Sequence, residues 1–271
     1  MRDFEYLDVK LEGKVAYMAL NRPQKANAVN KTLWFEIQDC IQALDELPEA
    51  RVVVIHGNGK HFCAGIDFSL LGDMQIKVGN LPEGQKQDQM FRHIRKMQDA
   101  FSAVSRCRKP VISAIHGSCI GAGVDLIAGC DMRYATRDAR FSIKEVDLGI
   151  VADVGSLQRL PYLIGDGLLR ELAFSGRFFS ALEAESMHLV NRTYVNTDIL
   201  MEEVQQIAND IASKSPLTIR GVKQMINYGR DHDADACLDY VANKNCSMLL
   251  SADTKEALSA MMEKRNPTFD D

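Results

Sequence analysis

The sequence predicts an α/β protein, because short apolar segments of strand length alternate with longer segments of helical periodicity. Two of the apolar segments, VVVIHG (52–57) and VISAIHG (111–117), both end in His-Gly, and amphipathic segments precede each of them. A chain of 271 residues with 46% hydrophobic residues can also bury one sizeable core. These observations favour one α/β domain, with or without an appendage.

The N-terminal segments predict a hairpin followed by a helix. Two strand-like runs flank the turn Glu12-Gly13-Lys14, and Pro23 ends the second run. The next segment has Asn30 in position to cap a helix N-terminus. Its apolar residues follow helical spacing at Leu33, Trp34, Ile37, Ile41 and Leu44.

The rest of the chain continues the alternation. Residues 52–57 read as a buried strand, and residues 85–106 as a helix that Lys109-Pro110 ends. Residues 111–117 read as a second buried strand. Residues 197–264 have a helical pattern.

Composition and charge argue against several classes of protein. The formal net charge of −5 gives no overall footprint for nucleic acid or an anionic membrane. Seven scattered cysteines without a CxxC pair indicate reduced thiols and argue against structural zinc. The N-terminus lacks a signal-peptide pattern, no segment approaches a membrane span, and the last residues are not an SKL-type address. We expect a cytoplasmic protein, or the mature form of a mitochondrial or peroxisomal one.

Two glycine-containing loops follow the two buried strands. They are NGKHFCAGID (58–67) and SCIGAGVDL (118–126). Loops at corresponding strand ends can form two walls of one site, although each glycine taken singly could serve only a turn. The second loop becomes helix-compatible, so the amides around Gly121, Ala122 and Gly123 predict a helix N-terminus that attracts an anionic oxygen. A second amide from the CAGID segment would complete an oxyanion hole.

The sequence resembles the crotonase family, also called the enoyl-CoA hydratase/isomerase superfamily. The resemblance rests on four segments in the family's order and at its spacings. They are NRPQKANA (21–28), FCAGID (62–67), KPVISAIHGSCIGAGVDLIAGCDMRYAT (109–136) and LGIVADVGSLQRLP (148–161). The resemblance implies a spiral of ββα units over residues 1–195, with the acyl-CoA site, and a helical oligomerisation region over residues 196–271.

The resemblance also implies how the substrate is held. The oxyanion donors would be the backbone N–H groups of Ile66 and Ala122, where the family usually has glycine at the second position. A CoA thioester would be the substrate, with no further cofactor and no metal, and the assembly a homotrimer or a dimer of trimers. Residues implied in CoA or substrate binding are Lys25, Ala26, Ala28, Ala64, Asp67 and Gly121, although Lys25 taken alone would more often be an ordinary surface lysine.

Three acidic residues indicate the reaction. Hydratases of the family have two glutamates, which correspond here to Asp125 and Glu145. Asp153 is an additional carboxylate, and this combination most resembles the Δ3,5-Δ2,4-dienoyl-CoA isomerases of β-oxidation. Shifting a 3,5-diene to the 2,4-diene requires proton loss at C2 and proton gain at C6. Glu145 is then the expected base and Asp153 the expected acid, in exchangeable roles, while Asp125 orients a neighbour or a water.

Several alternatives stay open on sequence alone. Asp153 could be a helix N-cap, Asp125 a first-turn acid favoured by the helix dipole, and Asp147 a structural acid. An enoyl-CoA hydratase using Asp125 and Glu145 is the nearest alternative function. Non-catalytic RNA binding is a third possibility, which the acidic balance disfavours. Acyl-chain length depends on residues 70–89, whose conformation the sequence does not reveal. His56, His61 and His116, and the thiols of Cys63 and Cys119, are expected to be structural.

Overall fold

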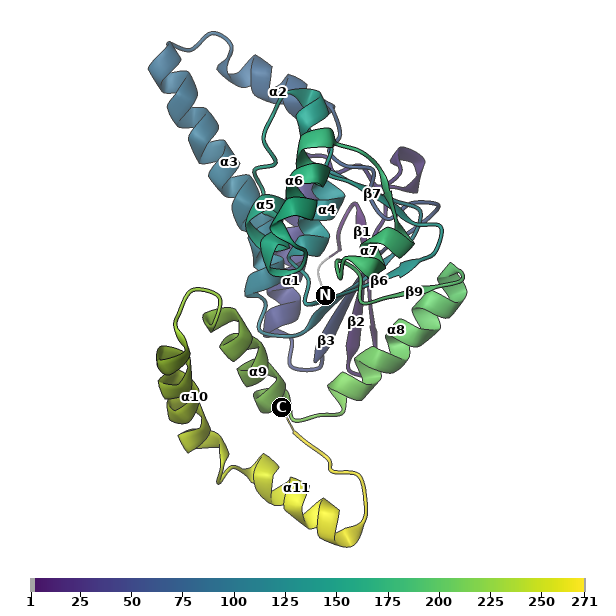
Figure 1. The fold of residues 1–271 in the computed structure, drawn as a ribbon, viewed down its shortest axis with the longest axis vertical. Helices are drawn as coiled ribbons and strands as arrows, with labels where there is room; N and C mark the ends of the chain where they lie inside the picture. The colour runs from purple at the N-terminus through teal and green to yellow at the C-terminus, as the bar shows by residue number, and fades with distance from the viewer. Residues whose placement is uncertain (1–2, 271) are drawn as a thin grey trace.

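A six-stranded sheet in the order β1-β2-β3-β4-β6-β9 forms the centre of the fold (Figure 1). The computed structural model describes residues 3–270. β1 is antiparallel to β2, and every other neighbouring pair in this sheet is parallel. A smaller sheet has the order β5-β7-β8. The strands are β1 (Leu7–Glu12), β2 (Val15–Leu20), β3 (Val52–Gly57), β4 (Val111–Ile115), β5 (Ser118–Ile120), β6 (Met132–Thr136), β7 (Arg140–Ser142), β8 (Phe179–Ser180) and β9 (Arg192–Tyr194).

Helices separate most of these strands, and the predicted α/β class is confirmed. The α-helices are α1 (Lys31–Glu46), α2 (Ser69–Val78), α3 (Glu83–Arg106), α4 (Ala122–Ala128), α5 (Ser156–Arg159), α6 (Asp166–Ser175), α7 (Ala181–Ser186), α8 (Thr197–Ala212), α9 (Pro216–Tyr228), α10 (Ala234–Met248) and α11 (Ala252–Glu263). Short 3₁₀ helices are η1 (Pro23–Lys25), η2 (Glu145–Leu148) and η3 (Leu160–Tyr162).

The central sheet separates two apolar cores. Because successive side chains of a strand point to opposite faces, Val53 and Ile55 of β3 join the larger core, whereas Val52 and Val54 join the smaller one. α8 covers the smaller core and runs beside the sheet (Figure 1). The helical C-terminal region predicted from residue 196 therefore begins with a helix that is a layer of the α/β core.

The predicted hairpin and first helix are both confirmed. Gly13 turns the chain between β1 and β2 with a φ of 59°. Asn30 caps α1, since its side-chain oxygen accepts a hydrogen bond from the Leu33 N–H at 2.9 Å. Trp34 of α1 stacks on Phe101 of α3 with ring centroids 4.4 Å apart. α1 and α3 thereby pack against each other next to the site described below.

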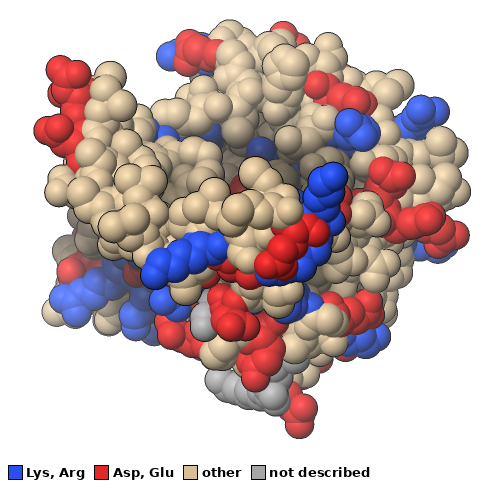
Figure 2. Space-filling view, turned by 90° about the horizontal axis from the view of Figure 1, so that it is seen from below, with Lys and Arg blue, Asp and Glu red and all other residues tan. Residues whose placement is uncertain are grey.

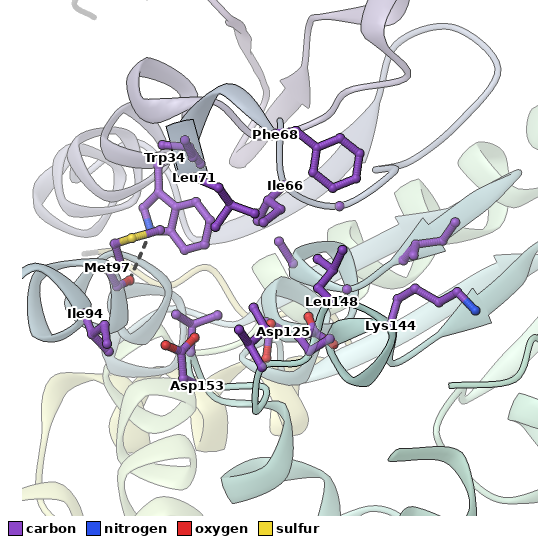
Figure 3. A pocket seen from close by; sticks show the side chains of 18 of the residues that line it. Trp34, Ile66, Phe68, Leu71, Ile94, Met97, Asp125, Lys144, Leu148 and Asp153 are labelled. Atoms are coloured by element: carbon purple, nitrogen blue, oxygen red, sulfur yellow. Dashed lines mark hydrogen bonds between the residues drawn. The ribbon is translucent and has the colours of Figure 1, made fainter. Parts of the chain in front are cut away.

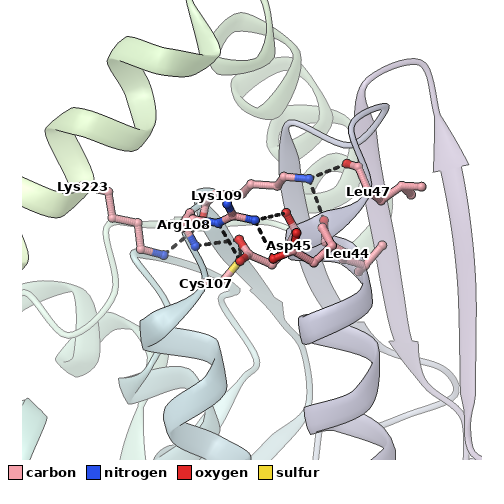
Figure 4. Close-up of polar contacts among 8 residues, drawn as sticks. Leu44, Asp45, Leu47, Cys107, Arg108, Lys109 and Lys223 are labelled. Atoms are coloured by element: carbon pink, nitrogen blue, oxygen red, sulfur yellow. Dashed lines mark hydrogen bonds and ion pairs between the residues drawn. The ribbon is translucent and has the colours of Figure 1, made fainter. Parts of the chain in front are cut away.

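Lys109 holds the C-terminal end of α1, which has no basic residue in its own last turn (Figure 4). Its ammonium donates to the carbonyl oxygens of Leu44 at 2.7 Å and Leu47 at 2.5 Å. Carbonyl groups at a helix C-terminus attract a cation, because they lack intrahelical partners and lie at the negative end of the dipole. The Lys109-Pro110 break thus ends α3 and also fixes α1.

Lys223 fixes α9 to the same region (Figure 4). Its buried ammonium pairs with the Asp131 carboxylate at 2.7 Å and donates to the Lys109 carbonyl at 2.9 Å. Beyond α9 the chain forms an arm, α10 and α11, that extends away from the sheet in Figure 1. Large apolar side chains on the arm are exposed, including Leu250 and Met262. The predicted oligomerisation role of this region stays a prediction.

None of the helices within residues 3–270 combines the length and the apolar character needed to cross a bilayer.

We expect Lys223→Met to lower the free energy of unfolding by about 2 kcal/mol, because it leaves the partly buried Asp131 carboxylate without its cation. Urea unfolding measures this change. Lys10→Met is the control, since Lys10 pairs with Asp8 at the exposed surface and should change stability by less than about 0.5 kcal/mol. Equal changes in the free energy of unfolding of the two variants would contradict the role of Lys223 in fixing α9.

Candidate active site

The two glycine-containing loops lie side by side, as the sequence predicted. The Phe62 N–H donates to the His116 carbonyl at 2.9 Å, and the Cys63 N–H donates to the Ser118 carbonyl at 2.9 Å. The Ile120 N–H completes the pairing by donating to the Cys63 carbonyl at 3.0 Å. Burial raises the pKa of the Cys63 thiol to about 12, so this thiol stays protonated. This agrees with the expectation that Cys63 has a structural role and is not a nucleophile.

Ile66 and Ala122, one from each loop, line the same pocket. Ala122 is the first residue of α4, so its N–H has no intrahelical acceptor, and Gly121 before it has a φ of 51°. Ile66 lines the pocket from the other loop. Among the described residues, neither the Ile66 nor the Ala122 N–H donates to another backbone group. The geometry therefore leaves both predicted oxyanion donors available.

The pocket between the loops is a largely apolar cavity of about 270 Å³ (Figure 3). Helices α2 and α3 supply most of its apolar wall, which the sequence did not predict. α2 lies in the segment whose conformation could not be read, and the helix predicted over residues 85–106 was not linked to the site. Trp34 of α1 also lines the cavity, and its Nε1–H donates to the Met97 carbonyl at 3.0 Å. The apolar lining residues of this wall are Trp34, Phe68, Leu70, Leu71, Met74, Met90, Ile94 and Met97.

All three predicted carboxylates line this cavity. They come from different elements: Asp125 from α4, Glu145 from η2, and Asp153 from the segment before α5. Asp125 is only 1% exposed, Glu145 is half-buried, and Asp153 is open to the cavity. The structure therefore brings the acidic residues together, and Figure 3 shows Asp125 and Asp153 below the apolar side chains of Ile66 and Leu71.

Asp125 connects α4 to α5. Its Oδ1 accepts a hydrogen bond from the Ser156 N–H at 2.7 Å. Burial raises the pKa of Asp125 to about 7, the Glu145 and Asp153 charges add to this, and the contact with Ser156 opposes it. The main polar contact of the Asp125 carboxyl group is therefore the Ser156 N–H, and not the N-terminus of α4.

The alternative that Asp153 caps a helix is wrong. The N-cap residue of α5 is Gly155, no side chain of its own segment caps it, and the Ser156 N–H is already bound by Asp125. The Asp153 carboxylate instead faces the cavity, where partial burial raises its pKa.

Glu145 lies beside the loop over residues 118–126. Burial raises its pKa, backbone hydrogen bonds oppose this, and the charge of Asp153 adds a smaller increase. Its Oε2 is buried without a hydrogen-bond partner among the described residues. A Cβ at Gly121 would come within 3.0 Å of Glu145 Oε1, so the glycine allows the carboxylate to approach the loop.

The neighbours of Glu145 have other contacts. Lys144 lines the cavity and was not predicted, and its ammonium donates to the Gly176 carbonyl at 2.9 Å. The same ammonium pairs with Asp147 at 2.6 Å. Asp147 does not line the cavity, which agrees with its reading as a structural acid.

The residues that the resemblance linked to CoA divide into two groups. Ala64 and Gly121 line the cavity, whereas Lys25, Ala26, Ala28 and Asp67 do not. The Asp67 carboxylate pairs with Arg22 at 3.1 Å, and the same guanidinium donates to the Ala28 carbonyl at 2.5 Å. These contacts shape the loop beside the cavity, and its role in binding CoA stays a prediction.

In the part of the chain that the structure describes, no group of three or more His, Cys, Asp or Glu side chains is placed to bind a metal ion. The predicted structural histidines have local contacts. His61 Nδ1 accepts from the Ser118 N–H at 3.2 Å, and His116 Nε2 lies 3.0 Å from the Gly59 carbonyl oxygen.

Comparison with known proteins identifies the family. The family profile described as enoyl-CoA hydratase/isomerase matches residues 10–271. The chain is 43% identical over 270 residues to the peroxisomal Delta(3,5)-Delta(2,4)-dienoyl-CoA isomerase of Arabidopsis thaliana, covering 99% of this chain and 97% of that protein. It is 44% identical over 257 residues to the mitochondrial isomerase of the same name from Mus musculus, covering 93% and 77%.

A solved structure supports the same assignment. The crystal structure of an enoyl-CoA hydratase from Bacillus anthracis superposes with a TM-score of 0.88 at 31% identity, covering 98% of this chain and 99% of that one. The predicted crotonase-type fold is confirmed, and the chain belongs to the enoyl-CoA hydratase/isomerase family.

Proposed function

We propose that this protein is a Δ3,5-Δ2,4-dienoyl-CoA isomerase. The observation that carries the proposal is the position of Asp153, whose carboxylate lines the same apolar cavity as Glu145 and does not cap a helix. The names of the relatives at 43% and 44% identity support it, while the solved hydratase is a more distant 31%. A hydratase using Asp125 and Glu145 would leave Asp153 without a function in the site.

The two free N–H groups suit the thioester carbonyl of the substrate. Ile66 and Ala122 would donate to its oxygen and stabilise the negative charge that develops when a proton leaves C2. The α4 N-terminus adds positive potential at this point, although α4 has only seven residues. The apolar wall of α2 and α3 would hold the acyl chain beyond the thioester.

Two carboxyl groups complete the proton transfer. Glu145 takes the C2 proton, and the electron pair moves through the carbonyl as a conjugated enolate. Asp153 gives its proton to C6, so that the double bonds end at C2–C3 and C4–C5. Glu145 finishes protonated and Asp153 ionised, and proton exchange with water or between the groups restores the starting state. The structure is also compatible with the two groups in exchanged roles.

The acidic cluster favours the mixed protonation state that this reaction needs. Burial raises the pKa of Glu145 and of Asp153, and the Asp153 charge raises the pKa of Glu145 further. Like charges in one apolar site resist ionising together, which favours a state with one neutral group and one carboxylate.

The remaining expectations concern partners. An acyl-CoA is the substrate that the family relationship supports, and no cofactor has a part in the proposed reaction. Assembly as a trimer or a dimer of trimers through the arm is supported by its exposed side chains Leu249, Leu250, Met261 and Met262.

A peroxisomal, mitochondrial or cytoplasmic location stays a prediction. On the face that Figure 2 shows, Lys and Arg lie among acidic and uncharged groups, and its described residues form no continuous basic stripe for RNA.

We expect Asp153→Asn to lower kcat for a 3,5-dienoyl-CoA by about 10²- to 10⁴-fold, because an amide cannot supply the C6 proton. The dissociation constant for a saturated acyl-CoA should change little, since the oxyanion donors remain. Stopped-flow absorbance of the 2,4-dienoyl product measures the rate. Asp147→Asn, which alters an exposed acid outside the cavity, is the matched control. Full activity of Asp153→Asn would remove Asp153 from the mechanism.

Glu145→Gln should cause a comparable loss of isomerisation and should also stop exchange of the C2 protons with D₂O, because the base that removes them is gone. Asp153→Asn should keep this exchange. Mass spectrometry of an acyl-CoA incubated in D₂O measures both variants. If Asp153→Asn abolished the exchange and Glu145→Gln kept it, the assigned roles would be reversed.

Asp125 should make stability depend on pH. Its pKa is about 7 in the folded protein and about 3.9 when unfolded, so the folded state binds the extra proton and stability falls as pH rises from about 4 to about 7. Asp125→Asn keeps an acceptor for the Ser156 N–H but does not ionise. We expect its stability relative to wild type to increase by about 4 kcal/mol across this interval, with no further change above it.

Urea unfolding of both proteins between pH 4 and pH 8 measures this difference. A wild-type minus variant difference that stays constant with pH would show that Asp125 ionises normally in the folded protein.

A further inference from the structure

Residues 153–156 are held by hydrogen bonds from two sides. On the α4 side, Asp125 accepts from the Ser156 N–H at 2.7 Å. On the α3 side, Gln98 Nε2 donates to the backbone carbonyl of Asp153 at 2.7 Å. The second contact acts on the backbone of the residue to which the proposed function gives a proton-transfer role.

We propose that Gln98 is a positioning residue that directs the Asp153 carboxyl group into the cavity. This inference rests on the proposed function. The bound carbonyl is attached to the same Cα that bears the Asp153 side chain, so fixing the carbonyl restricts the rotation that would turn the side chain away. The Asp153 carboxylate needs such support because it is open to the cavity and accepts no side-chain hydrogen bond among the described residues.

The Gln98 amide is itself oriented. Its Oε1 accepts from Arg95 Nη1 at 2.8 Å, which leaves the NH₂ group directed at Asp153. The preceding turn of α3 contributes Ile94 and Met97 to the cavity wall. One helix of 24 residues therefore places the apolar wall and also holds the segment that bears the acid.

Arg159 strengthens the same attachment one turn further along α3. Its guanidinium donates to the Val154 carbonyl at 3.3 Å and to Ser102 Oγ at 2.8 Å. A Cβ on Gly155 would lie 1.5 Å from Arg159 Nη1, so only glycine leaves room for this guanidinium. The segment from Asp153 to Ser156 is thereby joined to α3 through Gln98 and Ser102, which are four residues apart on one face.

The test is Gln98→Met, which keeps the length of the side chain and removes the donor. We expect kcat for a 3,5-dienoyl-CoA to fall about 10- to 100-fold with KM within about twofold of wild type, because a displacement near 1 Å is enough to misplace an acid. Gln87→Met is the matched control on the same helix, since the Gln87 amide reaches only the exposed Glu83 carboxylate. The thermal midpoints of both variants should equal that of wild type within about 2 °C.

A second measurement does not depend on the reaction. Hydrogen-exchange mass spectrometry of the peptide covering residues 150–156 should show faster exchange in Gln98→Met than in wild type and Gln87→Met. Unchanged exchange, or a kcat equal to that of Gln87→Met, would overturn the positioning role. If wild type failed to isomerise the diene, the proposed function would fail by itself, and the exchange result would still decide whether Gln98 holds the segment.

Discussion

The hydrogen bond from the Ser156 N–H to the Asp125 carboxyl group joins the two halves of the site. Asp125 belongs to the first turn of α4, next to the N–H of Ala122, and Ser156 follows the segment that bears Asp153. The loop that bears Ala122 and the segment that bears Asp153 are therefore joined by a buried contact. Because α4 is buried along its whole length, the core fixes the position of the Asp125 carboxyl group.

The same contact explains how acidic residues are tolerated in apolar surroundings. A buried carboxyl group without a partner is expensive, and here the N-terminus of α5 provides a donor to the most buried acid. Glu145 and Asp153 line the cavity instead, where burial raises the pKa of both carboxyl groups. The Asp147 carboxylate, which does not line the cavity, pairs instead with the Lys144 ammonium.

Local sequence patterns predicted the parts of the fold that depend on local interactions. The hairpin turn at Gly13, the cap at Asn30 and the helix start at Gly121 follow from residue type and spacing. The family resemblance added the carboxylates, all of which line one cavity. The partner of Asp125 could not be predicted, since it depends on how α4 packs against α5. The cavity wall formed by Met74, Met90 and Met97 could not be predicted from the sequence either, because tertiary packing decides the orientation of α2 against α3.

The most direct measurement compares two reactions of the wild-type protein at equal enzyme concentration: isomerisation of a 3,5-dienoyl-CoA and hydration of a 2-enoyl-CoA of the same chain length. A cavity with Glu145 and Asp153 at separate points along the acyl chain predicts a much larger kcat/KM for isomerisation, with the 2,4-dienoyl thioester as product. Efficient hydration without migration of the diene would contradict the account.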